Sequence, residues 1–242
     1  MVSSCKKDND ELDNPNGSWS VELTAECEST DSYRSKVMIE LAGTGTVTID
    51  WGDGTVLENF RMPELKEEDE WHEYEGAEYT HQYDKVGTYL VKISGQSGAI
   101  TLLEVSNNYN GMDFSSIVLN HCSRLQYLDC WGNQLTSLDV SKCTQLKELY
   151  CWDNELTSLD VSGCKQLKEL DCSENELTSL DVSKNTQLKE LYCYNNRLPE
   201  VVMNKIYNDL PVVGQGEGSI SVDRDTAGDY HIAENKGWNV YF

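Results

Sequence analysis

A unit of 21 residues is repeated along the second half of this chain. From Leu125 to about Glu200 it reads LQYLDCWGNQLTSLDVSKCTQ, LKELYCWDNELTSLDVSGCKQ, LKELDCSENELTSLDVSKNTQ and LKELYCYNNRLPE. A fixed period of this length predicts a solenoid, because each repeat forms one coil that buries its apolar edge only against its neighbours. The sequence therefore predicts a stack of coils in which equivalent residues lie in columns.

The repeated pattern L-x-x-L-x-C-x-x-N-x-L-x-x-L-x-V resembles the leucine-rich repeat family, with cysteine at the third apolar position. This resemblance implies that each L-x-x-L-x-C segment contributes a strand to a parallel sheet. We expect the leucines, cysteines and valines to stack inside the solenoid, each stabilising it by ~1.5–3 kcal/mol. We also expect inward amides that bond the loop backbone. These belong to Asn133, Asn154, Asn175 and Asn196.

Seven of the nine cysteines fall into two columns of the repeat. The columns are Cys130/Cys151/Cys172/Cys193 and Cys122/Cys143/Cys164, whereas Cys27 and Cys5 stand alone. No C-x-x-C motif occurs, which disfavours a zinc site of the usual spacing. Neighbouring coils are ~4.8 Å apart, within disulfide range, but parallel side-chain directions suit the bond poorly. We therefore predict buried free thiols.

Residues 18–98 predict an all-β domain, with strands near 19–25, 36–41, 46–51, 79–83 and 88–93. The segments WGDGT at 51–55 and YTHQYDKVGTYLV at 79–91 resemble the PKD domain. That resemblance implies an immunoglobulin-like β-sandwich. Val47, Ile49 and Trp51 share one face of their strand and are expected in its core.

Three features of this domain have alternative interpretations. Asp53 lies in a tight turn between glycines, where a metal ligand is one interpretation and an acceptor of turn N–H bonds is the favoured one. His81 is predicted to pack in its strand rather than to act in catalysis. The segment 61–78, RMPELKEEDEWHEYEGAE, is interpreted either as a cation-binding loop or, preferably, as a solvated insertion.

The start of the chain, residues 1–17, is polar and aperiodic, so we expect a disordered tether. Ser3-Ser4-Cys5 followed by an acidic run resembles the end of a bacterial lipoprotein signal. This resemblance implies lipidation of Cys5 and an outer-membrane, cell-surface location. Only four residues precede Cys5, without an apolar stretch, so the signal peptide would be truncated here. A plain disordered terminus is the alternative.

Two further segments flank the repeats. Residues 99–124 match a divergent first coil of a solenoid that extends over 99–198. Residues 199–242 predict a C-terminal cap with a short amphipathic helix over 199–210, a strand over 218–222, and a helix and strand within 227–240. The fold class is therefore mainly β: a PKD-like sandwich, a short solenoid with a parallel sheet, and a mixed α/β cap.

One side of the predicted parallel sheet is rich in aromatic and acidic residues. The candidate ligand-binding residues are Tyr127, Asp129, Trp131, Glu148, Tyr150, Trp152, Glu169, Asp171, Tyr192 and Tyr194. Such patches are typical of recognition surfaces. The alternative is a set of cross-coil contacts that only stabilises the sheet. A separate column, Asp139/Asp160/Asp181, is predicted to cap turns rather than to form a calcium ladder.

Composition and motifs disfavour several classes of function. A net charge of −23 disfavours nucleic acid, and no apolar run is long enough to span a membrane, which leaves contact only through a lipid anchor. The four histidines are scattered and no catalytic motif occurs, so we predict no enzyme, cofactor or metal. The sequence indicates a monomeric cell-surface recognition protein whose solenoid binds a protein or glycan, with the PKD-like domain as a spacer. A structural component of a surface complex and an accessory carbohydrate-capture module are the alternatives.

Overall fold

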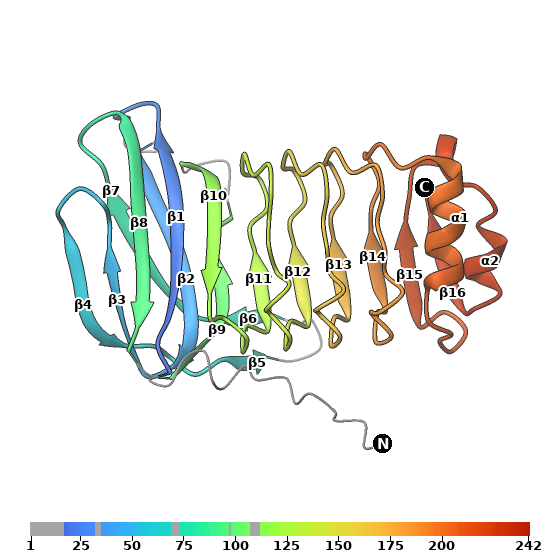
Figure 1. Cartoon of the computed structure of the whole chain (residues 1–242), viewed down its shortest axis with the longest axis horizontal. Coiled ribbons are helices and arrows are strands. Elements are labelled where there is room, and N and C mark those ends of the chain that lie inside the picture. Colours follow the sequence, from blue (N-terminus) through green and yellow to red (C-terminus); the bar gives the residue numbers. More distant parts are fainter. Residues whose placement is uncertain (1–16, 32–34, 69–72, 97, 107–111) are drawn as a thin grey trace, which may run out of the picture.

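The computed structural model of the chain describes residues 17–31, 35–68, 73–96, 98–106 and 112–242. The molecule is elongated, with a two-sheet unit at its N-terminal end, a row of coils in the middle and helices at its C-terminal end (Figure 1). No helix in the described part of the chain is long and apolar enough to cross a membrane.

The first sheet is antiparallel and belongs to the N-terminal unit. Its strand order is β10-β1-β8-β3-β4. In β1, every second side chain is buried, which is the period of a strand with one face on a core. Val47, Ile49 and Trp51 are buried together, as predicted. The bounds are β1 Trp19–Cys27, β3 Thr46–Asp50, β4 Val56–Arg61, β8 Gly87–Gly95 and β10 Asp113–Asn120.

The second sheet has nine strands and runs through the whole molecule, in the order β16-β15-β14-β13-β12-β11-β9-β2-β7. From β9 to β16 the strands are parallel, which confirms the parallel sheet predicted from the repeats. The bounds are β2 Lys36–Thr44, β7 Ala77–Gln82, β9 Ala99–Glu104, β11 Tyr127–Asp129, β12 Glu148–Tyr150, β13 Glu169–Asp171, β14 Glu190–Tyr192, β15 Gly218–Ser221 and β16 Trp238–Tyr241.

The segment 99–124 joins the two parts of the molecule through both sheets. Its first strand, β9, pairs antiparallel with β2 and parallel with β11. Its second strand, β10, pairs antiparallel with β1. The repeat pattern did not predict β10, because Phe114 and Ile117 fit the second half of a coil as well as a strand. The N-terminal unit and the solenoid therefore share one continuous sheet.

Two sets of columns hold the coils together. In the solenoid core, Leu128, Leu149, Leu170 and Leu191 pair in register and are fully buried. The asparagine column bonds the coil backbone as predicted. The Nδ2 of Asn154 donates to the carbonyls of Cys151 (3.2 Å) and, one coil earlier, Cys130 (3.0 Å). Its Oδ1 accepts from the Leu135 N–H at 3.0 Å. These bonds satisfy backbone groups that a tight turn leaves unpaired.

The eight cysteines of the described part of the chain are all free and buried, which confirms the prediction of free thiols. Cys5 lies outside the described residues. The column of Cys122, Cys143 and Cys164 continues in the next coil as Asn185, which is fully buried. The Asn185 Nδ2 donates to the carbonyls of Val161 (3.0 Å) and Cys164 (2.9 Å).

We predict that all seven solenoid cysteines are alkylated in denaturant without prior reduction, and that few react in the native protein. Burial raises the pKa of Cys122 and of Cys164 to about 12, so little thiolate forms in the folded state at neutral pH. Mass spectrometry of iodoacetamide-treated protein measures both states. Bridged peptides such as Cys130–Cys151 in unreduced protein would contradict the prediction.

The C-terminal segment closes the end of the solenoid. Helix α1 (Glu200–Asp209), predicted over 199–210, buries Met203, Ile206 and Tyr207. A short helix η1 (Arg224–Thr226) and helix α2 (His231–Glu234) follow before β16. Trp238 of β16 is buried, and its indole N–H donates to the carbonyl of Pro211 at 2.8 Å.

The acidic segment 61–78 contains a small two-stranded sheet of β5 (Lys66–Glu68) and β6 (Glu73–Glu75). Residues 69–72, between the two strands, lie outside the described residues. The choice between a solvated insertion and a cation-binding loop therefore stays a prediction.

Candidate binding face of the parallel sheet

The candidate ligand-binding residues all lie on one side of β11 to β14 and the turns that follow. Successive residues of a strand point to opposite sides, so Leu149 and Cys151 enter the core whereas Tyr150 and Trp152 lie on the other side. We call this surface the sheet face. It consists of Tyr127, Asp129, Trp131, Glu148, Tyr150, Trp152, Glu169, Asp171, Ser173, Glu190, Tyr192 and Tyr194.

Two pairs of aromatic side chains on the sheet face lie against each other across coils. The indole rings of Trp131 and Trp152 are nearly parallel, with centroids 4.3 Å apart and an interplanar angle of 6°. The ring centroids of Tyr127 and Tyr150 are 5.5 Å apart, and the two rings are tilted by 50°. In the third coil the equivalent of the tryptophans is Ser173, which is fully buried. Cross-coil stacking therefore exists, and it holds half-exposed aromatic rings in fixed positions.

Each tyrosine of the strands bonds a carboxylate two residues away. The Tyr127 hydroxyl donates to Asp129 Oδ2 (3.4 Å) and the Tyr150 hydroxyl to Glu148 Oε2 (3.3 Å). The same bond recurs in β14 between the Tyr192 hydroxyl and Glu190 Oε2, at 2.8 Å. Residues i and i+2 share one side of a strand, which is why the pairs meet. The tyrosine rings are thus oriented by their own strands.

Two of the acidic side chains are buried rather than solvated. Asp129 is 8% exposed and Glu148 is 5% exposed, although both lie on the sheet face. Asp129 accepts hydrogen bonds from the Trp131 N–H (3.2 Å) and from the Tyr127 hydroxyl. The alternation of the sequence gives the side of the strand correctly, but it does not reveal that aromatic neighbours cover these carboxylates.

This environment makes the carboxylates harder to ionise. Burial, reinforced by the nearby charges of Glu104 and Asp171, raises the pKa of Asp129 to about 8. Burial and the neighbouring Glu190 raise the pKa of Glu169 to about 7. The pKa of Asp171 is also raised, first by burial. Strongly shifted carboxylates gathered on one surface are typical of functional sites.

The opposite side of the solenoid has a structural role. The Oδ1 atoms of Asp139, Asp160 and Asp181 each accept the N–H of the serine two residues later at 2.9 Å, which confirms turn capping. Hydrogen bonds from those serines lower the pKa of each of the three aspartates. Within the described ranges, no group of three histidine, cysteine or acidic side chains is arranged to hold a metal ion.

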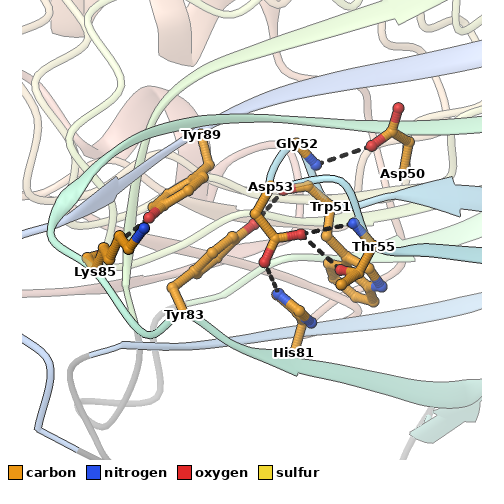
Figure 2. A network of polar contacts seen from close by, with 9 residues as sticks. All are labelled: Asp50, Trp51, Gly52, Asp53, Thr55, His81, Tyr83, Lys85 and Tyr89. Atoms are coloured by element: carbon orange, nitrogen blue, oxygen red, sulfur yellow. Dashed lines mark hydrogen bonds and ion pairs between the residues drawn. The ribbon is translucent and has the colours of Figure 1, made fainter.

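The glycine-flanked turn of the N-terminal unit forms a compact polar network (Figure 2). The Oδ1 of Asp53 accepts from the N–H (2.9 Å) and hydroxyl (2.6 Å) of Thr55, and Oδ2 lies 2.8 Å from His81 Nε2. Burial opposes ionisation, but hydrogen bonds from Thr55 and His81 lower the Asp53 pKa to about 2.

Aromatic side chains pack around this turn. The imidazole of His81 stacks on Trp51, with ring centroids 5.1 Å apart, and the Tyr83 hydroxyl donates to the Trp51 carbonyl at 2.6 Å. Asp53 thus accepts a turn N–H and His81 packs in β7, as predicted. The Oδ1 of Asp53 thus closes the turn on itself, and Oδ2 connects the turn to β7 through His81.

Three further glutamates continue the sheet face, and the sequence did not identify them. Glu104 of β9 pairs in register with Asp129, and Glu40 of β2 pairs with Glu104 on one side and with Glu78 of β7 on the other. These contacts depend on pairing between segments far apart in the chain. No local spacing in the sequence signals them.

Known proteins resemble the repeat region. A family model described as "Leucine Rich repeats (2 copies)" matches residues 123–164. The comparison with curated proteins gave no match. Among solved structures, the functional domain of InlJ from Listeria monocytogenes, which includes a cysteine ladder, is similar at 29% identity with a TM-score of 0.39. The similarity covers 50% of this chain and 26% of the InlJ chain.

Two other solved structures are similar at lower identity. The internalin InlF of Listeria monocytogenes is 19% identical, with a TM-score of 0.35, over 50% of this chain and 42% of its own. A leucine-rich repeat protein of Leptospira interrogans is 22% identical, with a TM-score of 0.31, over 41% of this chain and 32% of its own. The chain thus spans less than half of each of these structures. Its residues 123–164 are leucine-rich repeats.

Proposed function

We propose that this chain is a non-enzymatic recognition protein whose sheet face binds a protein ligand. Leucine-rich repeats are protein-interaction modules, and the sheet face is the surface of this one that gathers aromatic and charged groups. The observation that carries the proposal is the row of half-exposed rings held in place by stacking and by tyrosine–carboxylate hydrogen bonds.

Preorganised rings favour binding for a physical reason. Aromatic side chains bring a large contact area with few rotatable bonds, and a ring that is already fixed loses little entropy when a ligand arrives. Trp131 and Trp152 are fixed by their mutual stacking, and Tyr150 by its bond to Glu148. Aromatic anchors of this kind dominate the energy of many protein interfaces.

The stacking also favours a protein over a glycan. The broad faces of Trp131 and Trp152 that look toward each other are in contact, with an interplanar angle of 6°. A sugar ring that stacks on an indole needs such a broad face, and the mutual stacking takes up one of the two faces of each indole. Edges of rings interleaved with carboxylates suit the mixed polar and apolar surface of a protein.

The N-terminal part of the chain would connect the repeats to the cell surface. By its resemblance to the PKD domain, the N-terminal unit would hold the repeats away from their anchor. Lipidation at Cys5 would attach the chain to the outer membrane with the repeats at the cell surface. Incorporation of radiolabelled palmitate in wild type and its absence in Cys5→Ala, expressed behind a complete lipoprotein signal peptide, would test the anchor.

We predict that Trp152→Ala weakens the binding of a ligand to the sheet face by about 2 kcal/mol or more, which is roughly a thirtyfold loss of affinity. Trp152 lies between coils on both sides and stacks on Trp131, which makes it the central ring of the face. Protein and glycan arrays probed with the purified chain supply the ligand, and titration of the variant measures the loss.

The matched control is Asp139→Ala, on the opposite side of the solenoid, which should leave affinity unchanged. Thermal melting of both variants checks that the fold is intact. Loss of binding in Asp139→Ala with none in Trp152→Ala would place the binding surface elsewhere. Ligands found only on the glycan array, with weak salt dependence, would support the carbohydrate-capture alternative instead.

A further inference from the structure

The sheet face does not end at the first repeat. Glu78, Glu40, Glu104 and Asp129 are cross-strand neighbours in register, one on each of β7, β2, β9 and β11. Cross-strand neighbours on one side of a sheet have Cβ atoms about 5 Å apart. The adjacent residues Leu41 and Leu103 are fully buried, so these glutamates lie on the side away from the core. The strands β11, β9, β2 and β7 are neighbours in this order in one sheet.

The same surface continues through the repeats. Glu148, Glu169 and Glu190 pair in register across β12, β13 and β14, and Asp171 lies beside them on β13. We call the whole set the acidic row. It consists of Glu78, Glu40, Glu104, Asp129, Glu148, Glu169, Asp171 and Glu190. Asp129 and Glu148 of this row are buried, and the other six carboxylates still outnumber the three lysines that precede the strand glutamates in the repeats, Lys147, Lys168 and Lys189.

Like charges directly opposite one another destabilise a sheet. The effect is visible on both sides of the junction between the N-terminal unit and the repeats. Burial and then the charges of Glu40 and Glu78 raise the pKa of Glu104, and Glu104 in turn adds to the raised pKa of Asp129. A cation placed along the row would relieve this repulsion.

The aromatic rings provide an independent feature that suits the same ligand. Tyr127, Tyr150 and Tyr192 alternate with the carboxylates, and Trp131 and Trp152 flank them. Arginine and lysine bind both carboxylates and the faces of aromatic rings. Tyr127 and Tyr150 are tilted by 50° to each other and are not stacked face to face, unlike the two tryptophans. The net charge of −23 adds a long-range attraction for basic partners.

We infer that the ligand of the sheet face is a lysine- and arginine-rich segment of a partner protein, and that its binding surface extends from the repeats across the junction onto β9, β2 and β7. This inference rests on the proposed function. The N-terminal unit then takes part in recognition in addition to holding the repeats. The register partner of Asp129 on β12 is Tyr150, and the carboxylates continue beside it at Glu148. Charge complementarity along this acidic row is the argument for the occupant.

The test uses a random peptide library displayed on phage and selected on the full chain. We expect lysine- and arginine-rich peptides to be enriched, and their binding to depend on Trp152. The double variant Glu78→Gln/Glu104→Gln should weaken these peptides about fivefold or more at low salt. Glutamine at 104 keeps an acceptor for the Ser106 hydroxyl, which Glu104 binds at 3.0 Å, so the fold is preserved.

The matched control is Glu22→Gln/Glu58→Gln, which makes the same change in charge on the first sheet, in β1 and β4. It should change affinity less than twofold, since screening weakens distant charges. Equal losses in the two double variants would overturn the extension onto the N-terminal unit. Enrichment of uncharged peptides that still depend on Trp152 would overturn the basic partner while the proposed function stands. If no enriched peptide depends on Trp152, the proposed function itself fails.

Discussion

Leu149→Asp should destabilise the protein by more than about 4 kcal/mol and unfold the repeats around it. Leu149 is fully buried and pairs in register with Leu128 and Leu170, which are fully buried as well. Each coil buries its leucines only against the two neighbouring coils. A carboxylate at position 149 would therefore be buried among leucines, without a polar partner. Chemical unfolding followed by circular dichroism measures the loss.

A matched substitution separates this effect from the added charge. Thr157 belongs to the same coil and is exposed, so Thr157→Asp should change the stability by no more than about 0.5 kcal/mol. A melting temperature of Leu149→Asp within about two degrees of wild type would show that position 149 does not lie in a packed core.

The stability of the folded chain should also depend strongly on pH. The pKa of Asp129 is about 8 in the folded chain, against an ordinary value of 3.8. Between these values the folded state holds a proton that the unfolded state has lost, so the stability falls as pH rises toward 8. An asparagine side chain does not ionise, and Asp129→Asn should therefore be more stable than wild type at pH 8, on the order of 2–4 kcal/mol, and nearly equal to it at pH 4.

Asp160→Asn provides the opposite case on the other side of the solenoid. Hydrogen bonds from Ser162 lower the pKa of Asp160, so its ionised form stabilises the folded state above its ordinary pKa. This variant should be less stable than wild type at pH 8, and the difference should shrink as pH falls through the lowered pKa. Urea unfolding measures both differences, between pH 8 and pH 4 for Asp129→Asn and from pH 8 to below pH 3.8 for Asp160→Asn. An Asp129→Asn variant that gains no stability at pH 8 would show that Asp129 is solvated there.

The repeats were predictable because their contacts are local. Each leucine, cysteine and asparagine meets its equivalent in the next coil, so a fixed period in the sequence gives the register directly. The Asn154 bonds to the backbone of its own and the preceding coil follow from that register. Helix α1 was predictable for a similar reason, since Val202, Ile206 and Leu210 share one side of a helix and Pro211 ends it.

The junction and the electrostatics of the sheet face were not predictable in the same way. Strand β10 pairs with β1 through contacts such as Asn120 with Ser20, and no local pattern encodes a pairing over that separation. The meeting of Glu104 with Asp129 depends on the same long-range pairing. The alternation of residues places Asp129 on the correct side of its strand. Its burial depends on the three-dimensional arrangement of Tyr127 and the neighbouring coil.

The direction of the hydrogen bonds in the long sheet determines how the molecule bears a mechanical load. Neighbouring coils are joined along the long axis by backbone bonds such as Cys130 N–H to the Tyr150 carbonyl (2.9 Å) and Cys151 N–H to the Asp171 carbonyl (2.8 Å). Tension between the two ends loads these contacts in series, so the coils separate one after another. The first coil is held by β9 in one sheet and by β10 in the other. Tension should therefore separate the first coil from the N-terminal unit only after the later coils have separated from one another.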